Sequence, residues 1–289
     1  MPKPRITVVG PGRLGTALAR ALHDSGYPIA AIVHRPGSSA AQARALARDL
    51  KSRAVTALNP SGVVFLCAGD SQLPDLVADI TNADWRGVIA LHTSGALTSD
   101  VLAPLRHRGA AVGSMHPMMS FVRGAQTPLW GVWFGIEGQP KAVRAARSIV
   151  RNLGGEAMAV KKSAKPLYHA FGAFASPLLV ATLTLGERVG RRAGLSEREA
   201  RSAMKPIVEQ TLRNYLQSGA EGAFSGPLVR GDVDTIRKHL AALRAFPDAR
   251  AAYIALARSA CLTLPVKNRN AIRKLLSEPK KKKSAADER

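Results

Sequence analysis

Near its start the chain reads Arg5-Ile-Thr-Val-Val-Gly-Pro-Gly-Arg-Leu-Gly15. A β-rich run leads directly into the pattern G-x-G-x-x-G, and an apolar periodicity typical of a helix follows it. In such a unit Gly10 permits a tight turn, Gly12 lets the backbone approach a pyrophosphate, and Gly15 lets the helix pack closely on the strand. The stretch therefore predicts a dinucleotide-binding turn, with Gly10, Pro11, Gly12, Arg13, Leu14 and Gly15 as its cofactor-binding residues.

The rest of the first half alternates the two patterns. Strands are expected at 29–33, 63–67, 88–91, 110–114 and 132–136, with helices at 39–50, 73–80 and 141–152. This alternation is typical of an α/β fold, a doubly wound parallel sheet of the Rossmann type with helices on both faces.

Beyond about residue 160 no strand pattern appears. Helices are expected instead at 163–193, 196–216, 232–245, 248–262 and 268–276. We therefore predict a Rossmann-like dinucleotide-binding domain over residues 1–160, an all-helical domain over residues 161–279, and a basic disordered tail over residues 280–289.

The composition narrows the function classes. The 289 residues are 46% hydrophobic, which suffices for a folded core, and 42 Lys and Arg against 20 Asp and Glu give a net charge of +22. Such a charge fits a generally basic surface or an anionic small-molecule partner. Nucleic acid is not expected as a partner, because no basic helix carries interleaved aromatics and aromatic residues are only 5%.

Other classes of protein are also not expected. The two cysteines, Cys67 and Cys261, are far apart and have no metal-ligand spacing, so neither a disulfide framework nor a metal site is predicted. No apolar run reaches the roughly 18 residues of a membrane-spanning helix, so no membrane contact is expected. No signal-peptide pattern precedes the first strand, and a cytoplasmic protein is expected.

The end of the second predicted strand indicates which dinucleotide binds. An NAD site usually places Asp or Glu there for the ribose hydroxyls. This chain has His34 and Arg35 instead, followed by Ser38 and Ser39, which offer a guanidinium and two hydroxyls to a 2′-phosphate. The sequence therefore predicts NADP, with these four residues in the site. The alternative is that Arg35 is an exposed loop residue.

Candidate site residues follow three further strands, at the edge where this fold binds ligands. Cys67, Ala68 and Gly69 are expected along the ribose and nicotinamide side of the cofactor, with Cys67 a buried small residue rather than a nucleophile. The loops His92-Thr-Ser-Gly95 and Ser114-Met-His-Pro117 follow the other two. His116 is the candidate proton donor or acceptor, and Ser94 is a candidate substrate ligand or helix cap.

Two segments of the predicted helical domain also carry candidates. Lys165 and His169 share a helix face with Gly172 and Ser176, at spacings of 4, 3 and 4. This face would meet a ligand, or it holds an exposed Lys and a partly buried His. Further along the chain, the candidate substrate-binding residues are Ser225, Arg230, Asp232 and His239, although Asp232 also fits a helix N-cap.

These motifs together resemble a bacterial family that joins a Rossmann-like NADP-binding domain to a C-terminal helical domain of unknown function. The marks are the glycine pattern, the two histidine loops, Tyr168-His169, and Ser225-Gly-Pro-Leu-Val-Arg-Gly-Asp232 with His239. In architecture the family is similar to pyrroline-5-carboxylate reductase and ketopantoate reductase, which implies an NADPH-linked reductase working as a homodimer.

Two relatives imply roles for single residues. Gly113-Ser-Met-His-Pro-Met118 looks like a segment of prephenate dehydrogenases in which the histidine, here His116, interacts with the substrate hydroxyl that is oxidised. Ser94 matches a serine of the preceding loop in that family. The β-hydroxyacid dehydrogenases pair a Lys with an Asn four residues later, whereas Lys165 here pairs with His169.

We therefore expect an NADP-dependent oxidoreductase that transfers a hydride to or from a small, anionic C=O or C=N substrate bound between the two domains. His116, Ser94, Lys165 and His169 are the candidate catalytic residues. A prephenate-dehydrogenase-like oxidation and a non-catalytic NADPH-binding regulator remain the alternatives.

Overall fold

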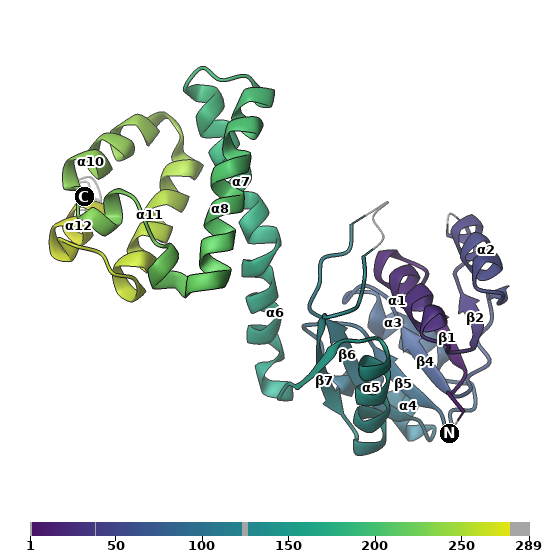
Figure 1. Cartoon of the computed structure of the whole chain (residues 1–289). Coiled ribbons are helices and arrows are strands. Elements are labelled where there is room, and N and C mark those ends of the chain that lie inside the picture. The colour runs from purple at the N-terminus through teal and green to yellow at the C-terminus, as the bar shows by residue number, and fades with distance from the viewer. Residues whose placement is uncertain (1, 38, 123–126, 278–289) are drawn as a thin grey trace, which may run out of the picture. The chain divides into compact units, whose positions relative to one another are not determined.

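A computed structural model describes residues 2–37, 39–122 and 127–277. The chain divides into two compact units, Met1–Ser176 and Pro177–Arg289 (Figure 1). The first unit contains an eight-stranded sheet of order β3-β2-β1-β4-β5-β6-β7-β8. Its strands are β1 (Ile6–Val9), β2 (Ile29–Val33), β3 (Ala54–Val55), β4 (Val63–Leu66), β5 (Ile89–His92), β6 (Ala111–Pro117), β7 (Trp133–Gly138) and β8 (Glu156–Ala159).

The first six strands form the doubly wound parallel sheet that the alternating pattern predicts, with the unpredicted short strand β3 at one edge. The order reverses between β1 and β4, and this reversal is the point where such sheets bind ligands. The strand predicted at 132–136 is β7, but it pairs antiparallel with β6 and so departs from the expected parallel sheet. The short strand β8, which the sequence pattern does not reveal, pairs parallel with β7.

Helices cover both faces of the sheet. They are α1 (Arg13–Asp24), α2 (Ala40–Asp49), α3 (Leu73–Ile80), α4 (Ala103–His107) and α5 (Pro140–Asn152), with a short 3-10 turn at Ser99–Leu102. A second 3-10 turn at Lys162–Ala164 leads into α6 (Lys165–Ala175), whose buried residue is Lys165. Helices α1, α2 and α5 share one core with the sheet. Helices α3 and α4 share another with its opposite face, where Trp85 is fully buried. Burial on both faces explains the continuous apolar run Val63-Val-Phe-Leu66.

The second unit is helical throughout its described part, as predicted. It contains α7 (Pro177–Arg192), α8 (Glu197–Ala223), α9 (Pro227–Arg230), α10 (Val233–Ala242), α11 (Pro247–Thr263) and α12 (Arg269–Leu276), with a 3-10 turn at Leu243–Ala245. Helices α10, α11 and α12 enclose a core of their own. The predicted capping box at the start of α8 is present, with Ser196 and Glu199 each bonding the other's backbone N–H.

The single long helix predicted over 163–193 is two helices. Ser176 leaves the helical conformation (φ −131°, ψ −84°) between α6 and α7, and Pro177 opens α7 without an N–H to continue the ladder. The division between the units falls at this break, whereas the sequence places it at 160/161. Helix α6 belongs with the sheet because Lys165 at its first position is buried against strand ends. The predicted tail at 280–289 lies outside the described residues.

The glycines of the first turn make a testable pair. A Cβ at Gly15 would lie 2.1 Å from the Gly10 carbonyl oxygen, whereas a Cβ at Gly12 would meet nothing within 4 Å. We expect Gly15→Ala to lower the free energy of unfolding by about 1–3 kcal/mol, since backbone must move to admit the methyl group. Gly12→Ala, the matched control, should cost less than about 1 kcal/mol.

Urea unfolding of both variants measures the difference. Equal losses at the two positions would contradict the assignment of Gly15 to close packing of α1 on the sheet.

Candidate functional site

The first unit encloses a cavity of about 1220 Å³ at the carboxyl ends of its parallel strands. The predicted residues that line it are Gly10, Pro11, Gly12, Arg13, Leu14, His34, Arg35, Ser39, Cys67, Ala68, Gly69, Ser94, His116 and His169. Two predicted residues of this unit, Gly15 and Lys165, do not line it, and Ser38 lies outside the described residues. Segments far apart in the sequence thus converge on one cavity.

The glycine turn forms one wall. Gly10 has a φ of +91°, and a Cβ there would lie 2.6 Å from the Cys67 carbonyl oxygen, so the turn needs glycine. Gly12 is the N-cap of α1 and has no side-chain cap. The N–H groups of the first helical turn therefore remain available to an anion beside an open backbone. This arrangement fits a pyrophosphate.

Cations line the cavity where β2 ends. The His34 ring Nδ1 lies 2.8 Å from the Arg35 carbonyl oxygen, and the Ser39 hydroxyl donates to the same oxygen at 3.3 Å. These bonds shape the loop that presents the exposed Arg35 side chain. Among the described residues that line the cavity, the basic side chains are Arg13 and Arg35. The lining residues of the loop that follows β2 include neither Asp nor Glu. The loop therefore fits a ribose phosphate better than a free ribose diol.

Imidazole rings line the cavity beyond β5 and β6. His116, within β6, and His169, on α6, have ring centroids 6.1 Å apart, nearly perpendicular. A Cβ at Gly95 would lie 2.8 Å from His116 Nε2 and 2.7 Å from His169 Cδ2. Gly95 thus leaves the space that both rings occupy. The rings bring two nitrogen-bearing side chains to a place where a small substrate could meet them.

Lys165 is buried behind this wall rather than within it. Its ammonium donates to the Ser94 carbonyl oxygen at 2.8 Å and to the Ser114 hydroxyl at 2.7 Å. Burial lowers the Lys165 pKa to about 8, while the carboxylates of Glu137 and Asp70 act in the opposite direction. In this position Lys165 joins α6 to the loop after β5 and to β6. Because Lys165 does not line the cavity, its catalytic contact with a ligand stays a prediction.

Ser94 does not cap the helical turn that begins at Ser99, as its alternative role supposed, because Thr98 is the N-cap there. The Ser94 hydroxyl instead accepts the backbone N–H groups of Ala96 at 3.2 Å and Leu97 at 2.9 Å within the loop. The same residue lines the cavity, so a substrate contact stays a prediction. These bonds hold the loop after β5 in a fixed shape.

The pocket histidine His116 is held neutral by its surroundings. Burial lowers its pKa to about 4, helped by the positive charge of Lys165 and by the neighbouring His169, and opposed by Asp70. Burial also raises the pKa of the Cys67 thiol to about 12, so this thiol is not an activated nucleophile. His116 therefore presents a neutral imidazole to the cavity near neutral pH.

His92 does not line the cavity. It ends β5, is fully buried, and its Nδ1 lies 3.2 Å from the Ser94 N–H. Burial lowers its pKa to about 3, with the positive charge of Lys165 acting in the same direction. Its role here is to shape the loop that carries Ser94.

The four candidates of the second unit stay predictions. Asp232 is the N-cap of α10, accepting the Thr235 N–H at 2.9 Å and its hydroxyl at 2.7 Å, as the cap interpretation expects. His239 Nδ1 lies 3.1 Å from the Tyr253 hydroxyl. Ser225 precedes the short helix α9 and Arg230 is its last residue, and both are exposed.

Sequence reasoning gave little weight to several residues at this site. Tyr168 contacts His116 although it lies off the predicted helix stripe. Asp70 and Phe121 also line the cavity. Gly95 and Gly135 hold open the space for aromatic and imidazole rings. The Tyr168-His169 pair is the sequence feature that could have indicated this site, because both adjacent side chains meet the His116 ring.

Comparisons with known proteins agree with this architecture. Residues 1–117 match the model of a Rossmann-like domain, and residues 132–260 match that of a domain of unknown function, DUF2520. The chain combines a Rossmann-like domain with a DUF2520 domain. The combination predicted from the motifs is thereby confirmed. No curated protein matches the chain significantly by sequence.

Solved structures share the fold. A candidate NADP oxidoreductase from Bacteroides fragilis is 22% identical, with a TM-score of 0.74 over 89% of this chain and 97% of its own. A reductive aminase from Aspergillus terreus, in complex with NADPH and ethyl-5-oxohexanoate, is 16% identical, with a TM-score of 0.65 over 94% and 99%. A pyrroline-5-carboxylate reductase from Coxiella burnetii is 14% identical, with a TM-score of 0.57 over 89% and 98%.

The buried imidazole of His92 makes stability depend on pH. Its pKa is about 3 in the folded chain and about 6.5 when unfolded, so below pH 6.5 the unfolded state binds the extra proton. Stability should be complete above about pH 6.5 and fall on acidification. His92→Asn keeps an acceptor for the Ser94 N–H, and should reduce the slope between about pH 5.5 and 4 by roughly 1.4 kcal/mol per pH unit.

Urea unfolding at a series of pH values measures this slope. His116 acts in the same direction and remains in the variant, so some slope should persist. An unchanged slope in His92→Asn would show that His92 binds its proton equally in both states.

Proposed function

We propose that this protein is an NADP-dependent oxidoreductase that transfers a hydride to or from a small C=O or C=N substrate. One observation carries the proposal: a glycine turn that fits a pyrophosphate and the His116–His169 pair line the same cavity. The neighbours of like fold include a reductive aminase in complex with NADPH and an imine reductase in complex with NADPH4. They also include a pyrroline-5-carboxylate reductase. The net charge of +22 supports an anionic substrate.

The residues divide the work along the cavity. The pyrophosphate would be held by the backbone of Gly10 to Gly12 and the start of α1. The 2′-phosphate would be bound by Arg35, Arg13 and Ser39. Small residues at Ala68 and Gly69 would let the cofactor pass close to the backbone. When bound, the reduced nicotinamide supplies a hydride. His116 and His169 would contact the group that changes its bond order.

Turnover tests the proposal directly. The full chain should oxidise NADPH in the presence of at least one member of a panel of 2-oxo acids, ketones and cyclic imines, followed by the absorbance of reduced nicotinamide. His116→Gln should lower kcat by about 10²-fold while it leaves NADPH affinity within about twofold.

Two other outcomes would replace the proposal. Dinucleotide reduction upon adding prephenate would identify the dehydrogenase-like oxidation. Tight NADPH binding without turnover across the panel would indicate a regulatory binding protein.

The cofactor arm of the same experiment uses Arg35. Arg35→Ala should weaken NADPH binding by about 10- to 100-fold, because a charge-assisted bond to phosphate is lost, and leave NADH binding unchanged. Arg44→Ala is the matched control, since Arg44 is exposed on α2 and does not line the cavity. Equal weakening of both cofactors by Arg35→Ala would remove the phosphate assignment.

We also propose that the protein is a homodimer through its helical domain. Helices α7 and α8 pack on each other, and both still carry exposed apolar side chains. These are Leu178, Val180, Val189, Ile207, Leu212, Tyr215 and Leu216, of which Leu216 is 81% exposed. Several exposed apolar side chains on one pair of helices are typical of an interface. A second copy carries the same surface, so it can bury this one by symmetry.

Sedimentation velocity checks the dimer. Leu212→Glu combined with Leu216→Glu, on one face of α8, should convert a dimer into a monomer. Leu262→Glu, at an exposed leucine of α11, is the matched control and should leave the dimer intact.

A monomeric parent chain would contradict the dimer. By length and composition alone, the helical segment Lys162–Arg192 is apolar enough to cross a membrane, which is weak evidence for such a role. A monomeric parent that sediments with lipid vesicles would therefore indicate membrane contact instead.

A further inference from the structure

Tyr168 contacts the pocket histidine from behind the cavity. Its hydroxyl oxygen lies 2.9 Å from His116 Nδ1, and the two rings meet edge to face with centroids 5.5 Å apart and planes at 84°. The second acceptor within reach of the hydroxyl is the His116 carbonyl oxygen, at 3.3 Å. The phenol therefore contacts one ring nitrogen of His116 and leaves the other, Nε2, toward Gly95 and the cavity.

The Tyr168 ring is fixed by its surroundings. Gly135 of β7 stands opposite His116 in the antiparallel ladder, and a Cβ there would lie 2.5 Å from the Tyr168 hydroxyl. Only glycine leaves room for the ring at this position. Helix α6, which carries Tyr168, is anchored three residues earlier by the buried ammonium of Lys165. The pairing of phenol and imidazole is thus built into the join between α6 and the sheet.

The hydrogen-bonding capacity of the two groups decides where the ring proton lies. His116 is neutral near pH 7, because its pKa is about 4, and so carries one ring proton. Burial raises the pKa of Tyr168 to about 12, so the phenol keeps its proton near neutral pH. Two acceptors lie within reach of its O–H, His116 Nδ1 at 2.9 Å and the His116 carbonyl oxygen at 3.3 Å, and the shorter distance favours donation to Nδ1.

We propose that Tyr168 is a positioning residue that holds His116 in the tautomer with the proton on Nε2. The residue then presents a neutral N–H donor to the cavity. The inference rests on the proposed function for its meaning, since the donor acts on the substrate of that reaction. Within the described residues Nε2 has no hydrogen-bond partner of its own, so the donor is free for a ligand.

This tautomer narrows the substrate class. A neutral N–H donor binds a lone pair, so it fits a carbonyl oxygen or the nitrogen of an unprotonated imine. A protonated iminium nitrogen has no lone pair to accept the bond. Negative charge that develops on a carbonyl oxygen during hydride addition would strengthen the same bond, which makes the donor more effective in the transition state than in the ground state.

Nitrogen NMR of the full chain labelled with ¹⁵N-histidine tests the tautomer without any substrate. The His116 signals are assigned by their loss in His116→Gln. In the parent chain at neutral pH we expect Nε2 protonated and Nδ1 unprotonated, with a shift toward the other tautomer in Tyr168→Phe. A parent chain with its proton on Nδ1, or a Tyr168→Phe variant with an unchanged tautomer, would overturn the proposal. If the variant does not fold, the parent spectrum alone decides.

The chain offers a matched control. His239 and Tyr253 of the second unit form a pair of the same geometry, with centroids 5.8 Å apart and planes at 86°. Tyr253→Phe should change the His239 signals and leave those of His116 as they are. A change at His116 in this control would show that the spectrum responds to tyrosine loss in general, and would overturn the specific assignment.

Kinetics separates this inference from the function on which it rests. In Tyr168→Phe, kcat should fall by about tenfold while the Kd for NADPH stays unchanged. The expected spectrum without turnover on any substrate would end the proposed function and leave the tautomer assignment standing. Turnover together with a proton on Nδ1, or an unchanged kcat in Tyr168→Phe, would overturn the inference and leave the oxidoreductase in place.

Discussion

A single buried ammonium group organises the reactive end of the cavity. Lys165 bonds the Ser94 carbonyl and the Ser114 hydroxyl, which belong to neighbouring strand ends, and so fixes the first turn of α6 against the sheet. Tyr168 and His169, three and four residues further along α6, contact His116 from this anchored helix. The Lys165 charge also adds to the effect of burial in lowering the pKa values of His92 and His116, so one group contributes to both the position and the protonation state of this region.

Charge is distributed unequally along the cavity. The two arginines of the described lining, Arg13 and Arg35, lie at the glycine turn and the end of β2. The residues that follow β5 and β6 add Ser94, the neutral imidazole of His116 and the His169 ring, and the carboxylates of Asp70 and Asp79 also line the cavity. The arginines therefore match the phosphate groups of a dinucleotide phosphate, whose reactive nicotinamide ring lies at its other end. The chain's large net positive charge therefore says less about the reaction than the placement of these few groups.

Local patterns predicted most of the first unit. The glycine turn, the buried strands and the loops at their ends depend on short spacings, and parallel topology then brings them to one edge. The errors came from interactions between distant residues. Periodicity ran unbroken through Ser176, although Pro177 divides the helix, and the weakly apolar β8 joins the sheet only because β7 offers it an edge.

The site residues divide in the same way. The linear sequence places His116 and the glycines, because strand ends are predictable. The linear sequence gave Tyr168 little weight, because helical spacing identifies only residues that share one face of the same helix. The contact between Tyr168 and His116 depends instead on how α6 packs against the sheet. Gly135 carries no motif at all. Its importance comes from a ring that arrives from 33 residues later in the chain, between 135 and 168.

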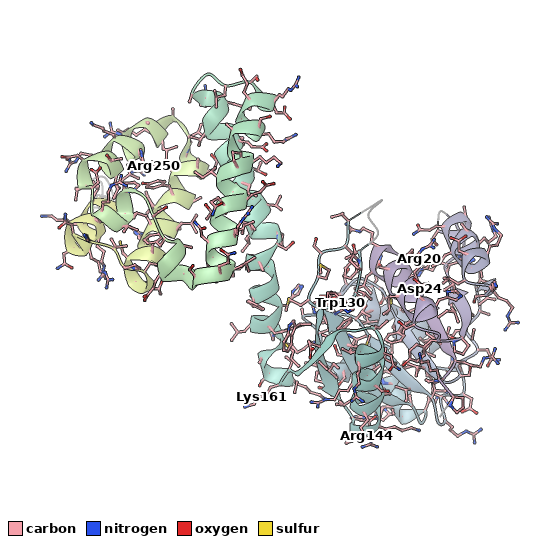
Figure 2. All side chains as sticks on the ribbon, viewed as in Figure 1. Arg20, Asp24, Trp130, Arg144, Lys161 and Arg250 are labelled. Carbon is pink, nitrogen blue, oxygen red and sulfur yellow. The ribbon has the colours of Figure 1, made fainter. Side chains whose placement is uncertain are left out.

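The division of the chain also separates its optical signals. All three tryptophans, Trp85, Trp130 and Trp133, belong to the first unit, where Trp85 is buried in the core and Trp130 is largely exposed (Figure 2). Indole fluorescence therefore follows the sheet-containing unit alone, while far-ultraviolet circular dichroism is dominated by helices of both units. Coincident melting of the two signals would mean that the units unfold as one cooperative body, and separate transitions that each keeps a stability of its own.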